Sequence, residues 1–288
     1  PASVTISAQD DTVCLGAITV ITSTITGGSG LYTYQWQQSP NGTSGWANVP
    51  ANGNTASYTV PTLVPQHFFY RLLVTDSANG CADPISNTTP VTVQNEPVLN
   101  ASANNPIVCI NGVSVISTTI TGGSGSFVYQ WQISPDGTSN WNNVSSGGNG
   151  PTYNVPTSTA GTFYYRIILT DTANGCDDPA PVVVLIEVES QPTVSISATN
   201  TNLCIGGSST ISSVVSNGSG FFTYQWQSSA DATTWANITN QGNGVSYNVP
   251  TGTPNSTYYR VLVTDAANGC NDPISNNVFI IVQNQPTV

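Results

Sequence analysis

The stretch Tyr32-Thr33-Tyr34-Gln35-Trp36-Gln37-Gln38-Ser39 decides the fold of this chain. Side chains alternate between the two faces of a strand, so Trp36 points inward while Gln35 and Gln37 point outward. The Tyr-Gln-Trp triplet recurs with its tryptophan at Trp131 and Trp226, 95 residues apart each time. We therefore expect the same half-buried strand, around the same buried tryptophan, three times in the chain.

Other features recur at about the same interval. They are Cys14, Cys109 and Cys204; the pairs Tyr70-Arg71, Tyr165-Arg166 and Tyr259-Arg260; and a loop Asp-x-x-Asn-Gly-Cys-x-Asp-Pro that contains Cys81, Cys176 and Cys270. A period near 95 residues is long enough for each copy to form a domain with its own core. We predict domains at 1–95, 96–190 and 191–284. Residues 285–288 are expected to begin a fourth copy, because Pro286-Thr287-Val288 repeats Pro192-Thr193-Val194.

One copy predicts about seven short strands and no helix, which fits an all-β immunoglobulin-like sandwich of two sheets. Asp10-Asp11-Thr12 is interpreted as a turn, and Asn79-Gly80 as a hairpin. In that fold a cysteine lies about 13 residues before the tryptophan, and a second lies two residues after a tyrosine. Here Ser23 and Leu72 occupy those places. The inter-sheet disulfide is therefore expected to be replaced by packing beside Trp36. Because the junctions are short, we predict three tandem domains in a head-to-tail rod.

The composition excludes several functions. Charged residues make up 6% of the chain, with no lysine, three arginines and a net charge of −11. Nucleic-acid binding requires a basic surface, and an anionic membrane surface would repel this chain. Nor does any apolar run reach the roughly 18 residues of a membrane span, so no membrane insertion is expected.

Six cysteines at repeated positions favour disulfides and an oxidising, extracellular compartment. Zinc is disfavoured, because no copy has a Cys-x-x-Cys pair or a histidine partner. Two pairings stay open. Each copy can hold one bond, or Cys14 can pair with Cys176 and Cys109 with Cys270, leaving Cys81 and Cys204 for neighbours beyond this chain. The second is slightly favoured: a seven-residue strand spans about 23 Å, whereas a disulfide needs Cα atoms within about 7 Å.

The repeated loop also offers oxygen ligands for calcium. The candidate ligands are Asp76, Asn79 and Asp83, then Asp171, Asn174 and Asp178, then Asp265, Asn268 and Asp272. Calcium takes six to eight oxygen ligands, more than one loop supplies. The competing interpretation, that aspartate and Asn-Gly only shape the turn, is favoured. No other cofactor is expected.

Catalysis has little support. His67 is the one histidine and has no counterpart in the other copies, and no set of catalytic residues or phosphate-binding loop is evident. Trp46, Trp141 and Trp235 are candidates for stacking on sugars, although covering a sandwich edge is the favoured role. We expect a protein that is not an enzyme.

Two runs in each copy, Tyr-Gln-Trp-Gln-x-Ser-x-Asp/Asn-Gly-Thr-x-x-Trp and Tyr-Tyr-Arg-Val-x-Val-Thr-Asp-x-x-Asn-Gly-Cys, carry a family resemblance. The chain resembles the immunoglobulin/PKD-like repeats of giant Bacteroidetes cell-surface adhesins. The resemblance implies export by the type IX system, an extracellular place on the cell surface, and a stalk in an adhesive filament for attachment or gliding. Its partners would be neighbouring repeats and a surface glycan or substratum. A self-assembling sheath or S-layer-type filament, and an array of carbohydrate-binding modules, are the alternatives.

Three tripeptides look like the Asp-Ser/Thr-aliphatic sequon that Bacteroidetes use for O-glycosylation of exported proteins. The acceptors would be Thr12, Ser77 and Thr172, whereas Asp265-Ala266-Ala267 lacks the hydroxyl group. O-glycosylation at these three residues is therefore a prediction.

Overall fold

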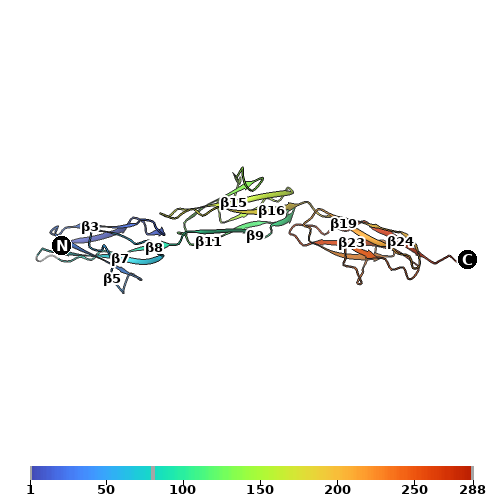
Figure 1. Cartoon of the computed structure of the whole chain (residues 1–288), viewed down its shortest axis with the longest axis horizontal. Coiled ribbons are helices and arrows are strands. Elements are labelled where there is room, and N and C mark those ends of the chain that lie inside the picture. The colour runs from blue at the N-terminus through green and yellow to red at the C-terminus, as the bar shows by residue number, and fades with distance from the viewer. Residues whose placement is uncertain (1, 79–81, 287–288) are drawn as a thin grey trace.

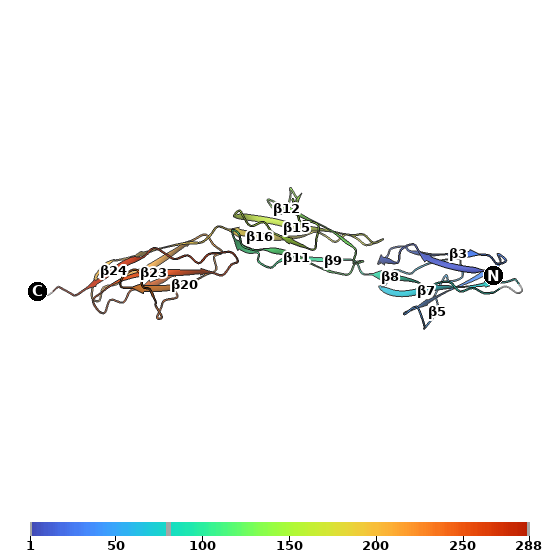
Figure 2. The ribbon, with the colours of Figure 1, turned by 180° about the vertical axis from the view of Figure 1, so that it is seen from behind.

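A computed structural model describes residues 2–78 and 82–286 (Figure 1). Three β-sandwiches follow one another in a single row, with the two termini at opposite ends of an elongated molecule. The view from behind shows the same arrangement, with the strands running along the long axis (Figure 2). The predicted all-β fold, with three tandem immunoglobulin-like repeats, is confirmed.

Each repeat contains eight strands. Repeat 1 has β1 Ser3–Ala8, β2 Thr12–Cys14, β3 Val20–Thr26, β4 Tyr32–Ser39, β5 Ala47–Asn48, β6 Ser57–Thr59, β7 Gln66–Asp76 and β8 Thr89–Gln94. Repeat 2 has β9 Val98–Ala103, β10 Ile107–Cys109, β11 Val115–Thr121, β12 Phe127–Ser134, β13 Asn142–Asn143, β14 Thr152–Asn154, β15 Gly161–Asp171 and β16 Val182–Glu189. Repeat 3 has β17 Thr193–Ala198, β18 Asn202–Cys204, β19 Thr210–Ser216, β20 Phe222–Ser229, β21 Ala236–Asn237, β22 Ser246–Asn248, β23 Asn255–Asp265 and β24 Val278–Gln283.

Two sheets pack face to face in each repeat. In repeat 1 a three-stranded sheet has the order β1-β3-β6, and a five-stranded sheet has the order β2-β8-β7-β4-β5. Neighbouring strands are antiparallel except β2, which runs parallel to β8. Repeats 2 and 3 have the same two sheets in the same order.

The expected turn at Asp10-Asp11-Thr12 is wrong in its last residue, because Thr12 begins strand β2. Val13 is fully buried, and the N–H of Thr92 in β8 donates to the Asp11 carbonyl at 2.8 Å. The burial of Val13 and the pairing with β8 together favour a strand over a turn. As a result β2 carries Cys14 to the C-terminal end of the repeat, where the last strand also ends.

Trp36 is the centre of the core of repeat 1 and has no exposed surface. Its indole N–H donates to the Thr55 carbonyl at 2.9 Å, and its ring stacks on Tyr58 with centroids 6.0 Å apart. Leu72, directly opposite in the register, is also fully buried. Burying a leucine side chain stabilises the fold by about 1.5–3 kcal/mol. Ser23 is only half-buried and donates to the Ala56 carbonyl, so the packing beside Trp36 rests mainly on Leu72.

Tyr70 gives the core a defined response to high pH. Burial, with a smaller contribution from Tyr58, raises the pKa of Tyr70 above its ordinary value of 10.0, and burial similarly raises the pKa of Tyr165 and Tyr259. The folded state therefore holds these phenol protons more tightly than the unfolded state does. That contribution to stability is complete below pH 10 and is lost as the pH rises above it.

We predict that the free energy of unfolding stays level toward pH 10 and then falls. The slope should be about 1.4 kcal/mol per pH unit for each of these tyrosines that ionises on unfolding. Urea titrations between pH 8 and pH 11.5 measure it. Tyr70→Phe, which removes one such proton, should flatten the slope, and an unchanged slope would show that Tyr70 ionises equally in both states.

Candidate functional site: the junctions between repeats

At each junction, the C-terminal end of one repeat meets a loop of the next. The loop follows β15 in repeat 2 and β23 in repeat 3, and it carries the Asn-Gly-Cys sequence. The facing surface is formed where the short parallel strand (β2 or β10) and the last strand of the preceding repeat (β8 or β16) end. We call these the junction loop and the socket.

The junction loops are bonded covalently to the sockets. Cys14 pairs with Cys176 and Cys109 pairs with Cys270, with the Cα atoms 4.8 Å apart in both bonds. Of the two pairings that the sequence leaves open, the structure therefore contains the one between repeats. Cys204 is free, whereas Cys81, like Asn79, lies outside the described residues. In the chain-entropy model, closing a loop with a sequence separation of 162 stabilises the folded state by about 5 kcal/mol.

Backbone contacts complete the first junction. The Cys14 N–H donates to the Asn174 carbonyl at 3.3 Å, and Val13 and Asn174 form a parallel bridge. The Asn174 side chain donates to the Asp10 carboxylate at 2.9 Å and to the Ile18 carbonyl at 3.1 Å. Asn174 therefore continues the sheet of repeat 1 into repeat 2.

The second junction uses the same loop position, but the asparagine side chain accepts a hydrogen bond there, whereas it donates in the first junction. The Cys109 N–H donates to the Asn268 carbonyl at 2.9 Å, and Val108 bridges Asn268. The Asn268 side-chain oxygen accepts the N–H of Val113 at 2.6 Å. In repeats 2 and 3 the Asn-Gly sequence lies in the loop that joins two antiparallel strands, and this loop contacts the preceding repeat. The hairpin predicted at Asn79-Gly80 lies outside the described residues.

The glycine of the junction loop permits this close contact. Gly175 has φ +73°, and a Cβ atom there would lie 2.2 Å from the Cβ of Ala17. Gly269 has φ +78°, and its Cβ would lie 2.3 Å from the Cα of Gly112. A side chain would therefore clash with the socket and strain the backbone.

The linker residue beside the second junction holds both partners. The side-chain amide of Gln191 donates to the Ile110 carbonyl at 3.1 Å and to the Gly269 carbonyl at 2.9 Å, and its oxygen accepts the N–H of Asn271 at 2.8 Å. In the first junction Glu96 has the same place, and its carboxylate accepts the N–H of Asp177 at 2.8 Å. The junctions are therefore packed and hydrogen-bonded around the disulfides.

The aspartates proposed as calcium ligands hold the junction loop to its own repeat. Asp171 is buried and accepts the N–H of Ser124 at 2.7 Å, the Ser124 hydroxyl, and the N–H of Ala173 at 3.1 Å. Asp178 accepts the N–H of Asp171 at 3.0 Å. The corresponding carboxylates accept the same backbone donors in repeat 1 (Asp76, Asp83) and repeat 3 (Asp265, Asp272).

Calcium binding stays a prediction, and the structure divides its ligand set. Asn174 and Asn268 face the preceding repeat, whereas the aspartates face N–H and O–H donors. Asp171 also lies near the sulfur atoms of Cys14 and Cys176, and Asp265 near those of Cys109 and Cys270. In the oxidised protein these sulfur atoms are bonded to each other, so each cluster offers a metal only one carboxylate.

Two of the three predicted glycosylation acceptors lie at the first junction. Thr12 and Thr172 both line a shallow hollow of about 480 Å³ between repeats 1 and 2. Thr172 is exposed and donates to the Ser126 carbonyl at 3.0 Å. Ser77 is exposed next to Asp76 in the loop of repeat 1. Modification at these residues stays a prediction.

The second set of tryptophans lies against the arginines. The guanidinium of Arg71 is 4.2 Å from the ring centroid of Trp46, and the same contact joins Arg166 to Trp141 and Arg260 to Trp235. Arg71 also donates to the side-chain oxygen of Gln37 at 2.8 Å. One face of each of these rings is therefore covered by its own repeat, which favours a structural role over sugar stacking. His67 shares a hydrogen bond with Thr92 and packs on Phe69.

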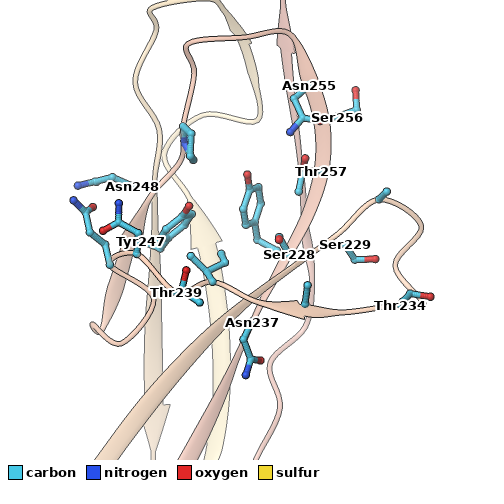
Figure 3. Close-up of a pocket in the computed structure, with 17 residues that line it drawn as sticks. Ser228, Ser229, Thr234, Asn237, Thr239, Tyr247, Asn248, Asn255, Ser256 and Thr257 are labelled. Atoms are coloured by element: carbon cyan, nitrogen blue, oxygen red, sulfur yellow. The ribbon is translucent and has the colours of Figure 1, made fainter.

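Repeat 3 contains an open hollow of about 860 Å³ beside β21 (Figure 3). Hydroxyl and amide side chains surround it, among them Ser228, Asn237 and Thr257, with Tyr247 nearby. The related hollow of repeat 2 is about 350 Å³. There, Ile133 and Phe163 occupy the positions of Ser228 and Thr257, so smaller polar side chains accompany the larger hollow.

We predict that the junction disulfides resist reduction while the repeats are folded. Reduction requires a thiolate to reach a sulfur atom. Cys14 is fully buried, Cys176 is only partly exposed, and the nearby Asp171 carboxylate disfavours the approach of a second negative charge. In millimolar dithiothreitol, Cys204 should be alkylated at once and Cys14 at least about tenfold more slowly. Alkylation followed by mass spectrometry measures both, with urea-unfolded protein as the control. Equal rates in the native protein would contradict the prediction.

Comparisons with known proteins agree with the repeats. A family model described as a domain of unknown function (DUF8696) matches residues 2–95, 100–190 and 193–284. Among curated proteins, none matches this chain. The described residues contain no helix long and apolar enough to cross a membrane.

Several solved structures of tandem domains are similar to the chain. Chicken CNTN1 FN1–FN3 domains are 16% identical, with 98% of this chain and 99% of that chain covered and a TM-score of 0.40. Domains A168–A170 of titin are 14% identical over 96% of this chain and 99% of that chain, with a TM-score of 0.41. At these identities and TM-scores, the similar structures say nothing about the contacts at the junctions.

Proposed function

We propose that this chain, which belongs to the DUF8696 family and contains three copies of its domain, is a non-catalytic, force-bearing stalk. The observation that carries the proposal is the covalent path through the oxidised rod. Cys14–Cys176 and Cys109–Cys270 each join the C-terminal end of one repeat to the N-terminal end of the next. The backbone linkers join the same ends, so every junction has two covalent connections.

These connections leave repeat 2 with two short tethers between its neighbours. One runs from the linker after repeat 1 through residues 96–109 and then crosses to Cys270 of repeat 3. The other crosses from Cys14 of repeat 1 to Cys176 and continues through residues 177–190 to the second linker. Residues 110–175, which form most of the core, belong to neither tether.

The tethers have almost no slack. The first contains β9 and β10, which are already extended strands, and its length cannot exceed about 45 Å at about 3.5 Å per residue. With repeats 1 and 3 folded, pulling on them loads these tethers instead of unravelling the core of repeat 2. A stalk that transmits tension needs this property, because an unfolding repeat would lengthen and release the load.

We predict that the two disulfides limit the extension of the oxidised chain to about a third of that of the chain without them. Pulled from both ends and fully unfolded, its shortest covalent path contains about 100 residues, or roughly 340 Å, against roughly 1,000 Å for the chain without disulfides. Single-molecule force spectroscopy measures the contour length. The double variant C14S/C109S, which keeps Cys176 and Cys270 but forms neither bond, should reach the longer value.

Comparing the contour lengths of the oxidised protein and the C14S/C109S variant also shows whether the proposal is wrong. If the oxidised protein and C14S/C109S release the same contour length, the bonds do not carry the load and the proposal is wrong. C204S is the matched control, because it removes a free cysteine and should leave the contour length unchanged.

We place the stalk outside the cell, where disulfides persist. The low-charge polar surface and the resemblance to surface adhesins support attachment or gliding, with export by the type IX system, as the finer role. In this proposal the ligand is bound elsewhere along the filament. Labelling of intact cells with an antibody against these repeats tests the location, and labelling only after lysis would contradict it.

The hollow of repeat 3 favours a second function, binding of a neutral glycan. Its hydroxyl and amide side chains match the hydrogen-bonding groups of a sugar.

We expect repeat 3 to give this chain a glycan-binding signal, and we expect larger apolar side chains in the hollow to abolish that signal. The variant S228I/T257F introduces the residues that repeat 2 carries at these positions. It should therefore fold, and it should lose binding on a glycan array. Retained binding after refilling would place the site elsewhere, and a wild-type chain without any signal would remove this function.

A further inference from the structure

The C-terminal end of repeat 3 has the same structure as the two occupied sockets. In repeat 1 the socket strand places Val13 and Cys14 under the junction loop, and both are fully buried. Val108 and Cys109 are also fully buried in repeat 2. Their counterparts in repeat 3, Leu203 and Cys204, are both partly exposed. The surface that a junction loop covers twice in this chain is therefore uncovered the third time.

The polar groups of this third socket are already in place. The side-chain amide of Gln285 donates to the Ile205 carbonyl at 2.9 Å, as Gln191 does to Ile110 in the second junction. Its oxygen corresponds to the one that accepts the N–H of Asn271 in that junction. Asn200 donates to the Ser208 carbonyl at 3.1 Å, which holds the edge of the socket.

We propose that this socket, formed by residues 203–208 and Gln285, binds the junction loop of another DUF8696 repeat and forms a disulfide with it through Cys204. The inference rests on the proposed stalk function and extends it to assembly. The argument is one of continuity, since two copies of the same surface in this chain hold such a loop. In a solution of the isolated protein, the proposed occupant is the loop of repeat 1 in a second copy, because the sequence of that loop has Asn79-Gly80-Cys81 where repeat 2 has Asn174-Gly175-Cys176.

The bond forms by thiol–disulfide exchange. Oxidised glutathione first forms a mixed disulfide with Cys81 and releases one glutathione. The thiolate of Cys204 then attacks the Cys81 sulfur, the new bond replaces the mixed disulfide, and a second glutathione leaves with the proton that Cys204 lost. Oxidised glutathione has taken up both electrons.

The test is end-to-end assembly of the purified chain in a glutathione redox buffer. Non-reducing electrophoresis and mass photometry should show a ladder of dimers and longer species that increases with protein concentration. Peptide mapping should join Cys204 to Cys81. Bonds between two Cys204 residues, or no ladder at all, would overturn the proposal.

A variant of the socket separates docking from simple thiol oxidation. Gly207 corresponds to Gly112 in repeat 2 and to Ala17 in repeat 1, where the alanine Cβ lies against Gly175 of the bound loop and leaves no room for a larger side chain. Gly207→Leu should fill the socket, keep the Cys204 thiol and reduce the ladder at least about tenfold, as loss of shape complementarity predicts. Gly207→Ala, which copies repeat 1, is the matched control and should assemble. A full ladder from Gly207→Leu would contradict docking.

Circular dichroism and a count of reactive thiols confirm that Gly207→Leu is folded with Cys204 intact. Force spectroscopy of single chains reads the two internal disulfides alone. A chain that shows the shorter contour length but does not assemble would overturn only this inference, whereas a chain that assembles but extends to the longer value would overturn the stalk function.

Discussion

The contact between the junction loop and the socket determines how the rest of the molecule behaves. Each sandwich buries its own tryptophan in a hydrophobic core of its own. The loop of the next repeat adds a parallel bridge at Asn174, a backbone approach that only Gly175 permits, and a covalent bond at Cys176. Because three contacts of different kinds act within three consecutive residues, the junction resists both bending and separation.

Within a repeat, the central strands and the disulfide-bonded outer segments have different roles. The central strands around Trp131 provide the hydrophobic stability, and they lie between Cys109 and Cys176 in the chain. The outer segments of the repeat connect one junction to the next. In the proposed stalk, force along the rod would pass through segments that are already extended, and the position of the core in the covalent path would protect it. Conventional tandem sandwiches, joined only by linkers, lack this second path.

Charged residues contribute little to the stability of the rod. The three arginines lie on tryptophan rings, and the buried carboxylates of Asp76, Asp171 and Asp265 accept hydrogen bonds from their own repeats. Stability therefore depends on burial, backbone pairing and disulfides. These terms are less sensitive to salt than surface ion pairs are, which suits the extracellular stalk that we propose.

The sequence by itself determined the fold class and the period, because a buried tryptophan in an alternating strand and its recurrence are local patterns. It left the pairing of Cys14 open, it led us to read Asp10-Asp11-Thr12 as a turn, and it gave no sign that the Asn-Gly loop contacts another repeat. Only the tertiary structure decided these points. Thr12–Cys14 is a strand because Val13 is buried beside β8 and under a loop 160 residues away. Asn174 is a contact residue because a second domain lies against it, and no local propensity records that neighbour.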